Sequence, residues 1–185
     1  SQTSPFNYSA SFTDDRDVFV LSPEGGKIVH TKVYSEEENL QKTKANVKID
    51  RNGGFSSTIT INAQGTQYGY REGVQDDILK DQKLHYKDYW DYLNDLEIES
   101  LKFNNNKDSI VFTENLKLSS AKYASLTSDL LLFEPNVFNR HTYVPPRYKN
   151  RKLPFQIYRG YTDIDEYEIM IPEGFQIESL KEPVN

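Results

Sequence analysis

The side chains most able to do chemistry are few in this sequence, and their spacing does not suggest a reactive site. The three histidines, His30, His85 and His141, form neither HExxH nor any two-histidine spacing that would place two ring nitrogens on one metal. A lone histidine on a strand or helix is more often a packed or surface residue than a catalytic one. Cysteine is absent, which excludes thiolate catalysis, disulfides and cysteine-ligated metals.

Carboxylates are the next candidates. Asp163, Asp165, Glu166 and Glu168 lie close together in the sequence, an arrangement open to acid–base chemistry or to calcium. The segment lacks the glycine and the terminal glutamate of an EF-hand loop, and on a strand Asp163 and Asp165 share one face, ordinarily the solvated one. A serine nucleophile would need an elbow such as GxSxG, which does not occur. We therefore predict no catalytic residue, no cofactor and no metal site.

A basic, aromatic stretch is the main candidate for binding. Residues 135–160 hold six basic side chains and no acidic one, whereas residues 161–185 hold seven acidic ones and one basic. Such a stretch can cradle an anionic polymer, but the net charge of -6 argues against nucleic acid. Pairing with the following acidic strand or with an acidic neighbouring domain is favoured. The interface predicted here consists of Arg140, Tyr143, Arg147, Tyr148, Arg151 and Arg159.

Aromatic residues are abundant, with 13 Tyr, 10 Phe and one Trp in 185 residues. Exposed tyrosines can stack on sugars or peptides, although most tyrosines in a β fold fill strand faces and keep the hydroxyl at the edge. The length suits one domain, and the 36% of hydrophobic residues can form a core. We see no apolar run long enough for a transmembrane helix and no signal-peptide pattern.

The elements that would position these side chains are mostly strands. An apolar run over 18–21, a Pro-Glu-Gly-Gly turn and a second arm over 27–34 predict an N-terminal hairpin. Alternation over 44–50 and 55–64 around Asn52-Gly53 predicts a longer one. Further strands are expected over 96–103, 109–119, 126–133 (buried on both faces), 155–158, 163–171 and 175–180.

One amphipathic helix is expected between about Asp76 and Asn94, where Ile78, Tyr86 and Trp90 lie close to one stripe. Together these elements predict a mainly β fold, an antiparallel β-sandwich of broadly immunoglobulin-like architecture with that single helix. The N-terminal hairpin is expected to add strands to the sandwich or to lie along its edge.

Two stretches carry a family resemblance. Residues 11–29 read SFTDDRDVFVLSPEGGKIV, and from residue 135 the chain contains, in order, PNVFNR, YVP, RKLPF, GYTDID and IPEGF. In this order the motifs resemble the C-terminal region of large bacterial transglutaminase-like, papain-like multidomain proteins. The resemblance implies that residues 1–38 are the tail of a transglutaminase-like core and that residues 39–185 are a C-terminal β domain of unknown function.

The resemblance also implies a role without catalysis. In that family the catalytic Cys, His and Asp lie in the core, upstream of the matching part, so this chain would be a piece of a longer protein of the periplasm or cell surface. We expect a non-catalytic accessory domain that docks on the core of the same polypeptide or recruits substrate, with no nucleic-acid partner and no membrane insertion. The alternative is a carbohydrate- or peptidoglycan-binding module that uses exposed tyrosines. A carboxylate hydrolase is the third possibility, and no residue pair supports it.

Overall fold

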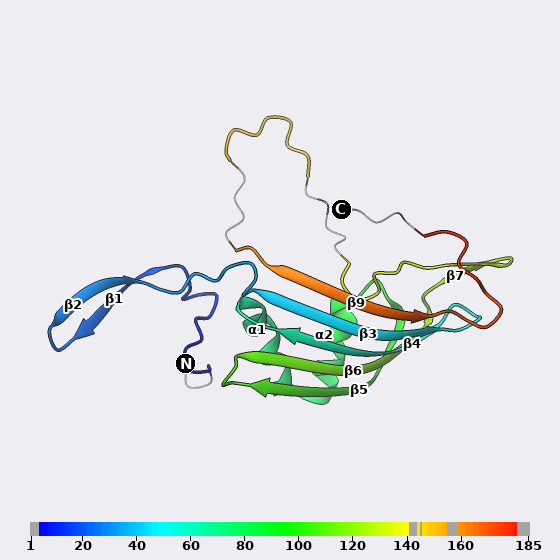
Figure 1. Cartoon of the computed structure of the whole chain (residues 1–185), viewed down its shortest axis with the longest axis horizontal. Helices are drawn as coiled ribbons and strands as arrows, with labels where there is room; N and C mark the ends of the chain where they lie inside the picture. Colours follow the sequence, from blue (N-terminus) through cyan, green and yellow to red (C-terminus); the bar gives the residue numbers. More distant parts are fainter. Residues whose placement is uncertain (1–3, 141–143, 145, 155–158, 181–185) are drawn as a thin grey trace.

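A computed structural model describes residues 4–140, 144, 146–154 and 159–180. Its largest element is a five-stranded sheet in the order β5-β6-β4-β3-β9, with the helices on one side of it (Figure 1). The strands of this sheet are β3 (Leu40–Ile49), β4 (Phe55–Ala63), β5 (Asn94–Asn106), β6 (Val111–Lys122) and β9 (Thr162–Met170). Two short antiparallel hairpins accompany it. The expected mainly β class is therefore confirmed.

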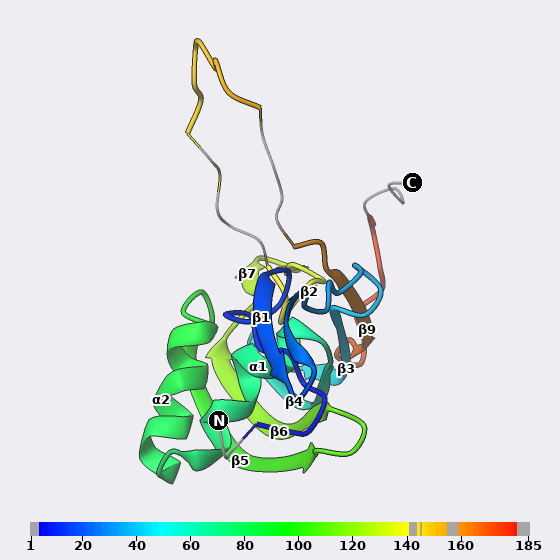
Figure 2. The same cartoon turned by 90° about the vertical axis from the view of Figure 1, so that its left-hand side faces the viewer.

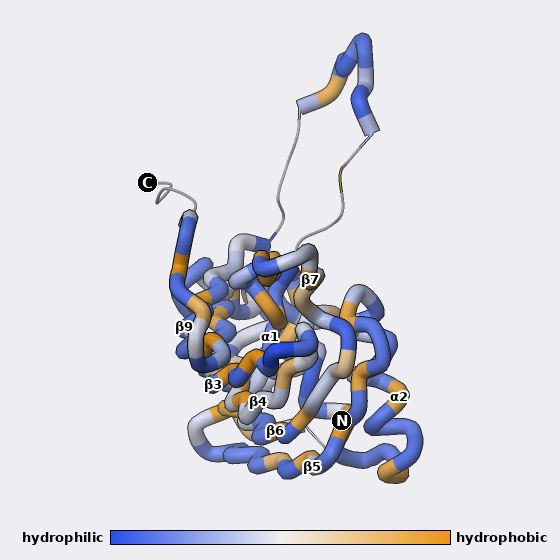
Figure 3. Tube along the Cα trace, turned by 90° about the vertical axis from the view of Figure 1, so that its right-hand side faces the viewer, coloured by the Kyte–Doolittle hydropathy of each residue, from blue (hydrophilic) through white to orange (hydrophobic). Residues whose placement is uncertain are grey.

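The sheet buries one face because apolar residues alternate with polar ones along its strands. In β3, Ala45, Val47 and Ile49 are buried, whereas Asn46 and Lys48 between them are exposed. Figure 3 shows this alternation as short hydrophobic stretches separated by hydrophilic ones. The turn from β3 to β4 closes as predicted, since the Asp50 carboxylate accepts the backbone N–H groups of Asn52 and Gly54 at 2.7 and 3.1 Å.

The covering layer consists of α1 (Thr66–Arg71), the 3-10 helix η1 (Glu72–Asp76), α2 (Leu79–Tyr89) and residues 133–138. The predicted helix corresponds to α2. The observed helix is shorter than predicted at both ends, because Ile78 is extended and the helix ends at Trp90. Helix α1 was not expected, since six residues are too few to show a 3.6-residue period. The core residues from this layer and from the turn that follows α2 are Tyr68, Val74, Tyr86, Trp90, Leu93, Val137 and Phe138.

One strand pair departs from the antiparallel expectation. Strand β9 runs parallel to β3, from Leu40 opposite Thr162 to Lys48 opposite Met170. A parallel neighbour needs a long crossover rather than a tight turn. Residues 50–161, which include β4, β5 and β6, separate the two strands in the chain. Before β9 this connection passes through the core at Val137 and Phe138, and residues 146–154 lie far from the sheet in Figure 2.

The N-terminal hairpin forms, but it does not join the large sheet as expected. Strands β1 (Asp17–Ser22) and β2 (Gly25–His30) make a separate two-stranded sheet that projects beyond one end of the molecule (Figure 1). Its outer turn follows Ser22-Pro23-Glu24-Gly25, where Gly25 takes a positive φ of 127°. Among the described residues, β1 and β2 pair with each other and contribute no residue to the core.

The predictions for the C-terminal part are only partly correct. The run over 126–133 is not a buried strand: it forms a short exposed hairpin, β7 (Ser125–Thr127) and β8 (Leu130–Leu132), because polar residues at 127–129 interrupt it. Strand β9 matches the expected strand at 163–171, whereas residues 175–180 form no strand. The strand expected at 155–158 lies outside the described residues. Within the described part, no helix has the length and apolar character needed to cross a membrane.

Candidate functional site

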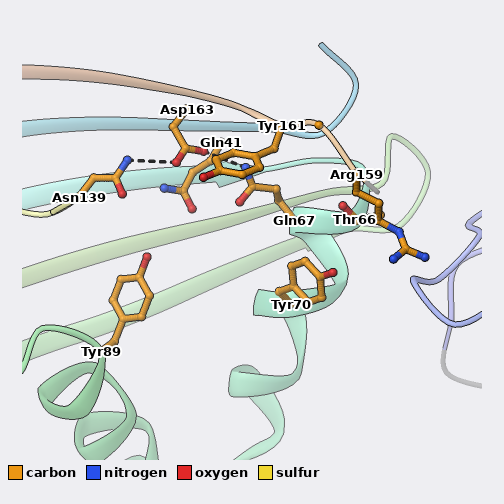
Figure 4. Close-up of a pocket in the computed structure, with 10 residues that line it drawn as sticks. Gln41, Thr66, Gln67, Tyr70, Tyr89, Asn139, Arg159, Tyr161 and Asp163 are labelled. Atoms are coloured by element: carbon orange, nitrogen blue, oxygen red, sulfur yellow. Dashed lines mark hydrogen bonds between the residues drawn. The ribbon is translucent and has the colours of Figure 1, made fainter. Parts of the chain in front are cut away.

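A pocket opens at the end of the sheet from which the N-terminal hairpin projects, between strands β3 and β9 and helices α1 and α2 (Figure 4). Its volume is about 370 Å³. The side chains that line it are Gln41, Thr66, Gln67, Tyr70, Tyr89, Asn139, Arg159, Tyr161 and Asp163, with the backbone of Gly160. We call it the tyrosine pocket, after Tyr70, Tyr89 and Tyr161.

A buried ion pair lies behind the pocket floor. Arg71, the last residue of α1, donates through Nη1 to both carboxylate oxygens of Glu114 at 3.0 and 3.1 Å, and Glu114 is 1% exposed. The same guanidinium donates through Nε to Gln41 at 2.9 Å and through Nη2 to the Tyr89 hydroxyl at 2.9 Å. Because α1, α2, β3 and β6 each supply one partner, the network holds the helices to the sheet.

Charge and burial shift the pKa values in this network. Burial disfavours the charged form of Arg71, but the Glu114 carboxylate outweighs that effect and raises the pKa of the guanidinium. Burial, followed by the field of Glu114, also raises the pKa of the Tyr86 hydroxyl. Arg71 therefore stays protonated, and Tyr86 keeps its hydroxyl proton, throughout the physiological pH range.

The upper wall of the pocket is a set of amides held by Asp163. Gln67 donates its side-chain nitrogen to Asp163 Oδ1 at 2.8 Å, and Asn139 donates its own to Asp163 Oδ2 at 3.2 Å and to Asp165 at 2.8 Å. Asn39 does not line the pocket, but its side-chain oxygen accepts from the backbone N–H and the hydroxyl of Thr66, which does. These hydrogen bonds fix which way each amide faces.

Arg159 closes one edge of the pocket and ties it to the N-terminal segment. Its guanidinium makes a bidentate pair with Asp14, at 2.5 and 2.7 Å, and donates to the carbonyl of Ser11 at 2.7 Å. Asp14 is 2% exposed. The hydrogen bond to Asp14 raises the pKa of Arg159. This pair holds the base of the hairpin against the domain.

The geometry offers binding groups rather than a reactive pair. Among the described residues, no three His, Asp or Glu side chains converge on a point where a metal ion could sit. His30 lies on the hairpin, where hydrogen bonds to the carboxylates of Asp17 and Asp15 raise its pKa. His85 stacks on the Tyr89 ring, and His141 lies outside the described residues.

The five described residues of the predicted interface do not all lie on one surface. Arg140 turns inward, donates to the Asn136 carbonyl at 2.9 Å and lies over the Tyr92 ring. Burial raises the pKa of that tyrosine to about 12. Arg159 pairs with Asp14, as described above. The other described residues of the set, Arg147, Tyr148 and Arg151, are exposed in the distant part of the loop, and Tyr143 lies outside the described residues.

Of the residues that line the pocket, sequence reasoning singled out Arg159, as part of the predicted interface, and the Asp163 carboxylate, and it missed the others. Gln41 and Asp163 are register partners in the parallel β3–β9 pair, 122 positions apart. The pattern of β3 shows which face Gln41 occupies, but only the pairing of β3 with β9 brings it beside Asp163.

The projecting hairpin is a second candidate surface. Phe19 and Ile28 are opposite each other and are 67% and 72% exposed, and Leu21 on the same face is 78% exposed. Val20 and Val29, on the other face, are more than a third exposed. We call these five residues the hairpin surface. An isolated two-stranded hairpin is marginally stable in water, so this apolar surface is suited to a partner.

Comparison with known proteins adds one finding. A family model described as "Domain of Unknown Function with solved-structure structure (DUF3858)" matches residues 129–185. The C-terminal part of the chain thus resembles a domain of unknown function. No curated protein and no solved structure matches the chain, and no comparison connects it with a transglutaminase-like protein.

The matched segment is not structurally separate from what precedes it. It contributes Val137 and Phe138 to the core and β9 to the large sheet, and the Trp90 indole donates to the Phe138 carbonyl at 3.0 Å. The tyrosine pocket likewise draws Asn139, Arg159, Tyr161 and Asp163 from the matched segment and its remaining side chains from residues 41–89. Both parts are needed to form the pocket.

Proposed function

We propose that this chain is a non-catalytic accessory domain of a transglutaminase-like protein of the periplasm or cell surface, and that it docks on the catalytic core of the same polypeptide. The observation that carries the proposal is the hairpin surface. Its five apolar side chains project beyond the domain, and none of them belongs to the core or packs against it. Exposed apolar patches of this kind usually mark an interface.

The attachment of the hairpin supports this role. Asp14 and Arg159 hold its base, and Thr31 bridges the two arms there through hydrogen bonds with Arg16 and Thr13. Beyond this base, the hydrogen bonds that the described residues of the two strands make are with each other. The hairpin is therefore presented outward from an anchored base, which suits insertion into a groove of a neighbouring domain.

The test is a calorimetric titration of the chain with the separately expressed transglutaminase-like core, with core activity as a second readout. We expect a micromolar or tighter complex. Burying one large apolar side chain contributes roughly 1.5–3 kcal/mol, so Phe19→Ser should weaken the complex about tenfold to a hundredfold. Leu84→Ser is the matched control, since Leu84 is 52% exposed on α2, away from the hairpin.

Two results would contradict the proposal. The first is that the wild-type chain neither binds the core nor changes its activity. The second is that Phe19→Ser and Leu84→Ser weaken the complex equally, because docking would then not use the hairpin surface. Both variants should keep the thermal midpoint of the wild type, since neither residue belongs to the buried core.

A further inference from the structure

The tyrosine pocket combines aromatic rings with fixed hydrogen-bonding groups. Tyr70 and Tyr161 are 65% and 55% exposed, and Tyr89 is 44% exposed, so all three rings are accessible from solvent. Figure 4 shows Tyr161 on the strand side of the pocket, and Tyr70 and Tyr89 on the helix side. A ligand in the pocket would therefore meet ring surfaces on two sides.

The Gln41 side chain supplies a buried donor. Gln41 is 4% exposed and lines the pocket, and its carbonyl oxygen accepts the Arg71 Nε–H at 2.9 Å. That bond fixes the amide, so its NH2 group is the end left to the pocket. No hydrogen bond joins this nitrogen to another described residue, and it is not one of the buried polar atoms that lack a partner, so it faces the open pocket. A ligand hydroxyl can accept from it in place of water.

The neighbouring amides provide acceptors. Gln67 and Asn139 both donate their nitrogens to Asp163, which leaves their carbonyl oxygens facing away from that carboxylate (Figure 4). The Tyr89 hydroxyl accepts from Arg71 Nη2, so its own proton is available for donation. The pocket thus offers both oriented donors and oriented acceptors beside the ring surfaces.

This array fits a ligand rich in hydroxyl groups, because each hydroxyl both donates and accepts. An anion is disfavoured, since the two arginines near the pocket, Arg71 and Arg159, are each already paired with a carboxylate. A volume of about 370 Å³ is at the small end of ligand pockets, which span roughly 300–1,000 Å³. One or two sugar rings would fill it.

We infer that the tyrosine pocket binds a neutral saccharide, with Tyr70 and Tyr161 stacking on the sugar and with Gln41, Gln67 and Asn139 bonding its hydroxyls. The site gives a location to the glycan-binding alternative that the aromatic composition suggested. It is independent of docking, because the hairpin surface contributes no residue to it.

The experiment is a two-dimensional NMR titration of the whole chain with cellobiose, maltose, mannobiose, lactose and di-N-acetylchitobiose, each alone. We expect at least one disaccharide to bind saturably at millimolar or tighter Kd and to shift resonances of the residues that line the pocket. Tyr161→Ala should weaken that binding by about tenfold or more. Tyr148→Ala is the matched control, since Tyr148 is 68% exposed on the distant loop, and should leave it unchanged.

Three results would overturn the inference: no saturable shift with any of the five disaccharides, shifts that map outside the pocket, or equal losses in Tyr161→Ala and Tyr148→Ala. Nα-acetyl-lysine amide tests a peptide as the competing class of ligand. Its binding in the pocket, without binding of any sugar, also overturns the saccharide inference. Phe19→Ser should retain saccharide binding, so failure of the docking proposal and failure of this one are distinguishable.

Discussion

Replacing Arg71 by methionine tests the view that the buried ion pair holds the helices on the sheet. The substitution keeps much of the side-chain volume and removes the charge. Glu114, 1% exposed, then loses its only ion-pair partner among the described residues. Gln41 and the Tyr89 hydroxyl also lose a charged donor each.

The expected loss is large. Breaking a buried pair by removing one partner costs about 3–5 kcal/mol, because it leaves a buried charge uncompensated. A domain has a total stability of roughly 5–15 kcal/mol, so the loss would be a large share of it. At about 2–4 °C per kcal/mol for a chain of this size, the thermal midpoint should fall by roughly 6–20 °C.

The assay is urea unfolding followed by the fluorescence of Trp90, which is fully buried. The control is Lys44→Met, which breaks the Lys44–Glu166 pair. That pair is shorter, 2.7 Å against 3.0 Å, but both its side chains are about two-thirds exposed. Exposed pairs contribute about 0–1 kcal/mol, so the urea midpoint of this variant should stay close to that of the wild type.

A double variant, Arg71→Met with Glu114→Met, separates the pair from the rest of the network. Removing both charges should recover part of the loss, because no buried charge remains without its counterion. The reasoning is wrong if Arg71→Met costs no more than Lys44→Met. It is also wrong if the double variant is less stable than Arg71→Met alone.

Three further predictions concern other contacts. Hydrogen bonds to the two flanking aspartates raise the pKa of His30, so protonated His30 should stabilise the hairpin. The protection of the β1–β2 backbone amides from hydrogen exchange should be complete below about pH 6.5 and be lost as pH rises through the folded-state pKa. His30→Gln should abolish this pH dependence. Asp14→Asn removes the charge that Arg159 meets at 2.5 Å and should make the N-terminal segment more open to limited proteolysis, without a comparable loss of global stability. Trp90→Phe leaves the Phe138 carbonyl without its indole donor. The lost hydrogen bond and the void should destabilise the fold by about 2–4 kcal/mol in urea unfolding. A loss below about 1 kcal/mol would contradict the role of Trp90 as a hydrogen-bonded core residue.

Local signals were enough to predict the elements whose pattern is short-range. The Asn52-Gly53 turn and the alternation on either side of it predict β3 and β4, because a two-residue period and a turn that needs a positive φ are properties of neighbouring residues. The glycine-rich turn near Gly25 predicts the N-terminal hairpin for the same reason. Trp90 and Tyr86 were likewise predictable as core residues from their helical spacing.

Local patterns misled where the environment of a segment depends on distant partners. The apolar run over 126–133 looks like a buried strand, yet β7 and β8 pair only with each other and remain exposed. The arginines of the basic stretch look like one surface, but Arg140 turns inward and Arg159 pairs with Asp14, 145 positions earlier. No rule of composition places those partners.

The tyrosine pocket depends on strand order, which the amino-acid pattern left open. Alternation shows which residues of β3 face the helices, because side chains on a strand point to opposite faces in turn. It does not show that β9 lies beside β3, since a parallel pair is joined by a long crossover without a turn signal. That pairing brings Gln41 next to Asp163 and the Gln67 amide of α1, and so decides where a ligand can bind.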